Sequence, residues 1–275
     1  EGQGASTGGY VLMDGDWWIP SGRLAYAANA PSAEAERASA RAHFFMPGRF
    51  TNAFGHSTVI EYDPLDLLVV STQDAVGNTV HSQNDYRVLQ ASRVTDANGN
   101  RAEVSFDALG MVAGTAVRGK EAENLGDNLE DFEPDPEQID LDALHDSADP
   151  HRVAPRLLKN ASTRIVYDLH RFFALHKAHP DESDLWRPVY AAILVRESHA
   201  TDPLPPEGLQ LQLSFSYSDG FGSEIQKKIQ AEPGQVEVRD AEGNFTVRDT
   251  TPALRWVSSG WTIFNNKGKP VRQYE

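Results

Sequence analysis

The sequence contains no cysteine among its 275 residues. Disulfide bonds, zinc sites built on cysteine and catalysis by a cysteine nucleophile are therefore excluded. The sequence also lacks any run of about 18 apolar residues, so we expect no direct insertion into a membrane. Phosphate binding needs clustered lysine and arginine, and since no such cluster stands out, we expect no nucleic-acid partner.

Two common enzyme signatures are missing as well, because the sequence has no P-loop and no H-E-x-x-H motif. Because the sequence has 40 aspartate and glutamate residues, a glycosidase-like pair of carboxylates remains an alternative, although no pair is singled out by its surroundings. We therefore predict no catalytic residue, no cofactor and no metal site.

The formal net charge is −15, and most of it comes from one segment. Residues 121–150 contain twelve acidic residues and no lysine or arginine, so the rest of the chain is nearly balanced. A solvated helical face is the simpler interpretation of this acidic run, and binding of cations or of a basic partner is the alternative.

The composition, with 40% hydrophobic and 24% charged residues, is that of a globular protein, and the length suits one large or two ordinary domains. The chain begins with Glu1 rather than methionine and ends at Glu275 without a closing element. We therefore take it to be a piece of a longer polypeptide.

A repeat with a period of 22 residues runs through residues 51–116. Gly55, Gly77 and Gly99 align in it, and an asparagine or aspartate precedes each glycine by three positions. Such a side chain can hydrogen-bond the backbone two residues further on, and glycine supplies the positive φ of a turn. Because β-branched residues alternate between these turns, each unit predicts a strand–turn–strand hairpin that buries its face by stacking on its neighbours.

The same turn signature returns later with looser spacing, each time beside a strand-like run such as residues 211–217, 245–247 and 261–264. A single D-x-x-G is weak, but seven of them indicate a repeat architecture. The predicted turn residues are Asn52, Gly55, Asp74, Gly77, Asp96, Gly99, Asp107, Gly110, Asp219, Gly222, Asp240, Gly243, Asn265 and Gly268.

These patterns predict a mainly β fold of antiparallel hairpins with short helical insertions. Residues 176–186 read as a polar loop, and residues 189–197, the most apolar run, read as a central strand. We divide the chain into a flexible N-terminal segment at 1–15, a first β segment at 16–118 with a helix near 32–43, an acidic helical insertion at 119–160, and a second β segment at 161–275, truncated at its C-terminal end.

Several longer strings also resemble a known family. They include DWWIPSGR at 16–23, HFFMPGRF at 43–50, NAFGHSTVIEYD at 52–63, VTDANGNRAEVSFDALGMVAGTAVRGK at 94–120, SFSYSDGFGSEIQKKIQAEPG at 214–234 and RWVSSGWTIFNNKGKPVRQYE at 255–275. This part of the chain is similar to the RHS/YD-repeat region of the B component of bacterial insecticidal toxin complexes, and to the related virulence-plasmid B proteins.

The resemblance implies a role in architecture. In that family the B component joins a C component, an RHS protein, to form a hollow β-sheet shell around a toxic C-terminal cargo, which a pore-forming A component delivers. The resemblance therefore implies a non-enzymatic, secreted or extracellular wall segment with those partners. A carbohydrate- or cell-surface-binding β module of an RHS-repeat protein is the alternative, and a glycosidase-like β enzyme is the third.

Three features could carry other chemistry, and each has a structural interpretation. Asp96, Asn98, Asn100 and Asp107 have the spacing of a calcium loop, but Arg101 stands where that loop needs glycine, so we favour a turn. The histidines at 170, 176 and 179 fit no standard ligand spacing. The tryptophans could form a sugar-stacking platform, although we expect them to be buried in sheet packing; they are Trp17, Trp18, Trp186, Trp256 and Trp261.

Overall fold

The computed structural model describes residues 10–147, 149–206, 208–253 and 255–274. The chain divides into two compact units, one comprising residues 1–104 and 117–125 and the other residues 105–116 and 126–275. Residues 126–160 of the predicted acidic insertion therefore belong to the second unit. Among the described residues, no helix has both the length and the apolar character needed to cross a membrane.

The first unit is a succession of antiparallel strands, each paired with the strand that follows it in the sequence. The strands are β3 (Gly22–Ala25), β4 (Arg49–Asn52), β5 (Ser57–Tyr62), β6 (Val69–Gln73), β7 (Thr79–Asp85), β8 (Gln90–Thr95) and β9 (Arg101–Phe106). Helix α1 (Ala33–Ala42) lies between β3 and β4, and it begins where the Ser32 hydroxyl accepts a hydrogen bond from the Ala35 amide.

A separate hairpin precedes these strands and consists of β1 (Val11–Met13) and β2 (Asp16–Trp18). Residues 10–15 thus contain a strand and a turn, so the prediction of a flexible segment over 1–15 is wrong for this part. The remainder of that predicted segment, residues 1–9, lies outside the described residues.

The second unit also consists mainly of antiparallel strands, in the order β10, β11, β12, β13, β14 and β17. These strands are β10 (Val112–Arg118), β11 (Thr163–Asp168), β12 (Val189–Arg196), β13 (Leu211–Ser218), β14 (Glu224–Ala231) and β17 (Arg255–Ser258). Two further hairpins pair only internally, namely β15 (Gln235–Arg239) with β16 (Phe245–Asp249), and β18 (Trp261–Phe264) with β19 (Pro270–Tyr274).

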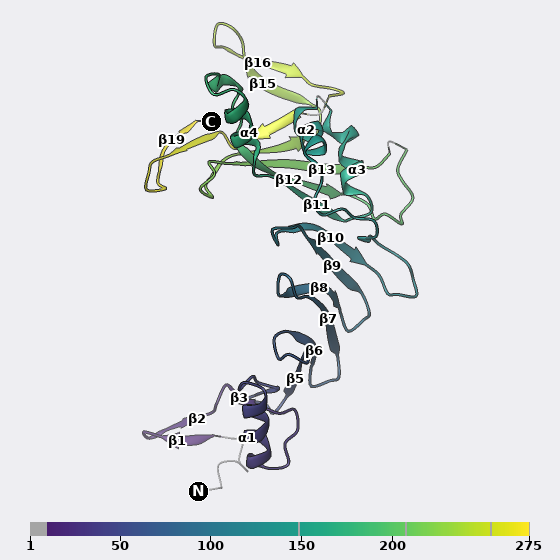
Figure 1. Cartoon of the computed structure of the whole chain (residues 1–275), viewed down its shortest axis with the longest axis vertical. Coiled ribbons are helices and arrows are strands. Elements are labelled where there is room, and N and C mark those ends of the chain that lie inside the picture. Colours follow the sequence, from purple (N-terminus) through teal and green to yellow (C-terminus); the bar gives the residue numbers. More distant parts are fainter. Residues whose placement is uncertain (1–9, 148, 207, 254, 275) are drawn as a thin grey trace. The chain divides into compact units, whose positions relative to one another are not determined.

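Helices lie against one face of the strands in the second unit (Figure 1). They are α2 (Gln138–Asp146), the 3-10 turn η1 (Pro150–Arg152) and α3 (Ala154–Leu158). In β13 the residues alternate between buried and less buried, with Leu213 and Phe215 among the buried ones. These side chains and leucines of α2 and α3, such as Leu144 and Leu158, form one hydrophobic core.

Helix α4 (Arg171–Ala178) and the 3-10 turn η2 (Ser183–Leu185) occupy much of the segment that we predicted to be a polar loop at 176–186. The prediction is therefore wrong for residues 176–178 and 183–185. The fold is mainly β and consists of antiparallel hairpins with short helical insertions, which confirms the predicted fold class.

Candidate functional site: repeat turns, acidic insertion and apolar pocket

The seven predicted turns share one arrangement of hydrogen bonds. In the first, the backbone amides of Phe54 and His56 donate to Asn52 Oδ1 at 2.9 and 3.0 Å. The same two side-chain bonds recur at Asp74, Asp96, Asp107, Asp219, Asp240 and Asn265. The glycine three positions later has a φ between 66° and 91° in every case: Gly55, Gly77, Gly99, Gly110, Gly222, Gly243 and Gly268.

Both carboxylate oxygens of Asp74 and of Asp96 accept hydrogen bonds within their own turns. Asn78 Nδ2 donates to Asp74 Oδ2 at 2.9 Å, and Asn100 Nδ2 donates to Asp96 Oδ2 at 3.0 Å. These side-chain bonds, with the backbone bonds, lower the pKa of both aspartates because they favour the ionised form. The geometry at Asp96 is that of a turn, because both of its carboxylate oxygens accept hydrogen bonds from groups of the same turn. Within the described ranges no group of three or more acidic or histidine side chains is arranged to hold a metal ion.

A second type of turn lies at the opposite ends of the strands in the first unit. Asp63 Oδ1 accepts hydrogen bonds from the Leu65 and Leu67 amides, and Tyr86 Oη of the next such turn donates to Asp63 Oδ2 at 2.7 Å. The bond from the Leu67 amide, followed by that from Tyr86, lowers the pKa of Asp63. Non-glycine residues take the left-handed position here, with φ 55° at both Asp66 and Leu89.

Asp63 and Asp85 also open turns, and the predicted turn residues do not include them. The signal was available, because an asparagine or aspartate recurs every 11 residues at positions 52, 63, 74, 85, 96 and 107. The first two 22-residue units therefore each contain two turns of different construction, one closed by glycine and one preceded by a β-bulge. In the third unit the turns at Asp96 and Asp107 are both closed by glycine.

The acidic insertion is attached to the second unit through ion pairs with two buried arginine side chains, Arg171 and Arg196. Asp127 is 1% exposed, and its carboxylate accepts hydrogen bonds from Arg196 Nη1 at 3.3 Å and from the Ala200 amide at 2.6 Å. Arg171, which is also buried, contacts Asp142 and Asp146 of α2 at 3.2 and 2.6 Å. The interpretation as a solvated face is therefore wrong for Asp127, whereas Asp142 and Asp146 are 51% and 58% exposed and agree with it.

Arg164 is a further buried cation of the second unit. Its side chain extends from β11, lies over the Phe132 ring at 4.4 Å from the centroid, and donates to the Glu133 and Pro134 carbonyls. Burial lowers its pKa to about 10, so the guanidinium stays charged at neutral pH. These contacts hold the loop before α2 against β11, which is a structural role.

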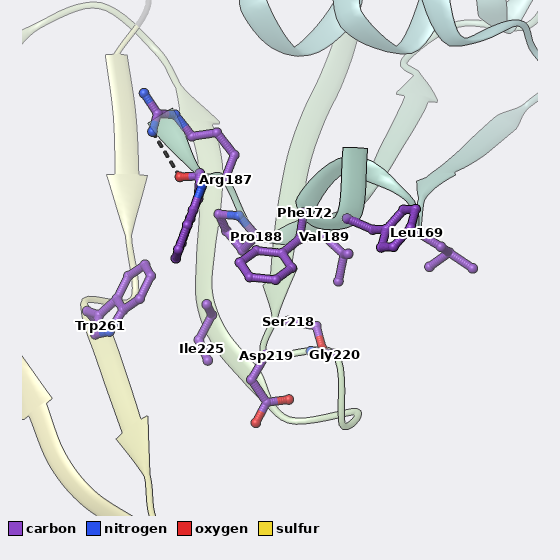
Figure 2. A pocket seen from close by; sticks show the side chains of 12 residues that line it. Leu169, Phe172, Arg187, Pro188, Val189, Ser218, Asp219, Gly220, Ile225 and Trp261 are labelled. Atoms are coloured by element: carbon purple, nitrogen blue, oxygen red, sulfur yellow. Dashed lines mark hydrogen bonds between the residues drawn. The ribbon is translucent and has the colours of Figure 1, made fainter. Parts of the chain in front are cut away.

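An apolar pocket of about 460 Å³ lies at one end of the second unit, beside α4. Figure 2 shows Phe172, Val189, Ile225 and Trp261 around it. Its polar side chains have partners of their own, since Asp219 and Ser218 accept bonds from backbone amides of their turn. Arg187 likewise donates to the carbonyls of residues 184 and 186. The lining is mostly apolar, so the pocket suits an apolar group.

The tryptophans are more exposed than we expected. Trp17 and Trp18 are 66% and 55% exposed, and Trp256 and Trp261 are 41% and 38% exposed. Burial in sheet packing is therefore a wrong prediction for these four, because helices cover only one face of the sheet in the second unit and the β1–β2 hairpin pairs only with itself. Of the three histidines, His170 and His176 are exposed, and His176 stacks on Phe172. His179 Nδ1 lies 3.0 Å from Glu182 Oε1.

Comparison with known proteins places the fold. No protein-family description and no curated protein matches the sequence. A solved structure of TcdB2-TccC3 matches with a TM-score of 0.65 and 22% identity, over 100% of this chain and 12% of the other. A TcdB2-TccC3-TEV structure (TM-score 0.64, 19% identity, 99% of this chain and 14% of the other) and a TcdB2-TccC3-Cdc42 structure (TM-score 0.62, 20% identity, 100% and 15%) are similar as well.

The chain thus spans about an eighth of the length of the solved chains that it resembles, and the low identity means that the likeness concerns the fold. That fold is an antiparallel repeat sheet of the kind found within toxin-complex proteins.

Proposed function

We propose that this chain is a non-enzymatic wall segment of a toxin-complex B-type protein, and that the wall encloses a toxic cargo. The observation that carries the proposal is the succession of hairpins, each paired with its sequence neighbour and closed by turns of recurring construction. Such a sheet extends by adding strands at its edge, which suits an enclosing surface. The similarity to TcdB2-TccC3 over the whole chain supports the same role.

The arrangement of polar groups also supports a structural role rather than catalysis. The best-buried carboxylates, Asp127 and Asp168, face the arginines Arg196 and Arg171. The aspartates of the repeats are engaged with the backbone of their own turns. Charged groups in these places hold segments together, which is what a wall requires.

The partners follow from the proposed role. A C-component RHS protein would complete the shell and supply the toxic C-terminal cargo, and a pore-forming A component would deliver it from a secreted assembly. The similar solved structure is named for two components together, TcdB2 and TccC3, and this supports the C-component partner most directly.

Protection of the cargo from protease tests the proposal. The full polypeptide that carries this chain is co-expressed with a C-component protein, and digestion of the cargo is followed over time. We expect the cargo in the complex to resist protease, and the double variant Gly77→Val, Gly99→Val to expose it, because both glycines have positive φ in the repeat turns.

Ala75→Ser, in the same turn, serves as the control and should leave protection unchanged. Cargo that is digested as quickly in the intact complex as when free would contradict the proposal.

The exposed tryptophans favour a second candidate function, which is binding of a carbohydrate or a cell surface. Trp17 and Trp18 on β2 are both more than half exposed, and exposed aromatic rings can stack on sugars. Glycan-array binding that disappears in the Trp17→Ala, Trp18→Ala variant would support this function. Absence of any glycan signal from the unaltered chain would remove it.

A further inference from the structure

The most exposed large apolar side chain in the described part of the chain is Phe221, at 95%. It occupies the third position of the turn that Asp219 opens, and its own side chain takes no part in the hydrogen bonds of that turn. The same position holds Asn98, Glu242 and Lys267 in three other turns of equal construction, and apolar residues in the remaining three: Phe54, Val76 and Leu109. Turn formation therefore does not require an aromatic residue at this place.

The residue lies next to a hollow of matching chemistry. Ser218, Asp219 and Gly220, which precede Phe221 directly, line the apolar pocket of about 460 Å³. Two aromatic residues of the same lining, Phe173 and Trp261, are 64% and 38% exposed. A protruding aromatic side chain and an open apolar pocket thus adjoin on one surface, and contiguous apolar surface of this kind marks an interaction site.

The two charged residues at the pocket are of opposite sign, so the surface is complementary to a second copy of itself in charge as well as in shape. Figure 2 shows Arg187 at one end of the pocket and Asp219 at the other. Both residues are exposed, and within the described residues neither forms an ion pair. In a contact with twofold symmetry the two ends of the patch exchange places, so a cation at one end meets an anion at the other.

We propose that this surface docks a second copy of the chain, with Phe221 of each copy in the pocket of the other and Arg187 facing Asp219 of the second copy. A twofold contact needs one patch that is complementary to itself, and here both the apolar and the charged parts meet that condition. The inference stands apart from the proposed wall function, because it depends only on the second unit.

Sedimentation of the chain over a range of concentrations tests the contact. We expect a monomer–dimer equilibrium that Phe221→Asn weakens about 30-fold or more, as loss of a buried aromatic anchor does. The substitution introduces the residue that Asn98 already supplies in an equivalent turn, so the fold is retained. Phe54→Asn is the matched control, since Phe54 has the same turn position and is 86% exposed but lies in the first unit; it should leave the dimer unchanged.

A second measurement distinguishes this contact from nonspecific association. Asp219→Asn keeps the turn, because Asn52 and Asn265 open theirs in the same way, but it removes the charge. We expect it to weaken the dimer by up to about 5-fold at low salt and less at high salt, whereas Asp240→Asn should have no effect. A chain that is still a monomer at about 1 mM, or equal effects of Phe221→Asn and Phe54→Asn, would overturn the proposal.

Discussion

The described residues of the first unit hold no buried hydrophobic side chain larger than alanine, and Ala25 and Ala40 are the buried apolar ones. In the second unit, by contrast, α2 and α3 cover one face of the strands and enclose a core that includes Leu158, Leu194 and Phe215. The strands of the first unit therefore depend on backbone pairing and on turn side chains, while those of the second also gain from burial of apolar surface.

The two units also differ in where their aspartates lie. In the first unit they lie at the ends of strands, where they bind backbone amides, as Asp63 and Asp74 do. In the second unit Asp127 and Asp168 are buried and face arginines. A buried carboxylate that pairs with an arginine is common to both units, because Glu103 of β9 is 8% exposed and lies 2.8 Å from Arg93.

The largest expected effect that separates the two units comes from removing core volume. Leu158→Ala should lower the free energy of unfolding of the second unit by about 2–5 kcal/mol, because Leu158 is fully buried in the core. Hydrogen exchange of peptides from β11 to β13 would measure the loss. Leu67→Ala in the first unit is the control and should cost less than about 0.5 kcal/mol, since Leu67 is 57% exposed. Similar losses in the two variants would remove the contrast.

A smaller effect is expected from the turns of the first unit. Gly77 has a φ of 91°, and no atom lies within 4 Å of the place that an alanine Cβ would take. The cost of Gly77→Ala is therefore conformational alone, about 1–2 kcal/mol, and exchange of the β6 and β7 amides should report it.

Leu89→Gly provides the comparison, because Leu89 already has a φ of 55° in the other type of turn and is 56% exposed. This substitution should be close to neutral or stabilising. A loss of stability equal to that of Gly77→Ala would show that the cost of Gly77→Ala does not come from the left-handed backbone conformation.

The glycine-closed turns could be predicted from sequence because their chemistry is local. An aspartate or asparagine and a glycine three positions later specify both the side-chain bonds and the positive φ, as Asn52 and Gly55 illustrate. The turns at Asp63 and Asp85 escaped prediction because residues other than glycine take the left-handed conformation there, so the usual marker was missing.

Long-range pairing limited what the sequence could reveal about the candidate site. Asp127 and Arg196 are 69 positions apart, and nothing near either residue predicts their ion pair. The apolar pocket likewise brings together Phe172, Ile225 and Trp261 from three separate elements. The exposure of Trp17 could not be predicted from the sequence either, because it depends on which hairpins lack a covering layer.

The smallest expected effect concerns pH and again distinguishes the covered sheet. His145 of α2 is stacked on Tyr190 at 4.8 Å between ring centroids, and burial lowers the pKa of its imidazole below the ordinary 6.5, although a bond to Asp146 opposes the shift. At a pH between the lowered folded-state pKa and 6.5, the unfolded chain therefore binds a proton at His145 that the folded second unit does not bind. The stabilisation from this group is fully present above pH 6.5 and is lost as the pH falls through the lowered folded-state pKa.

His145→Phe keeps an aromatic ring in the stack but cannot take up a proton. Between pH 7 and about 5, the loss of stability of the second unit should become shallower in this variant, as measured by urea unfolding at a series of pH values. His81→Phe, at an exposed position of β7 in the first unit, should leave the slope unchanged. An unchanged slope in His145→Phe would mean that the buried imidazole does not make the covered sheet sensitive to acid.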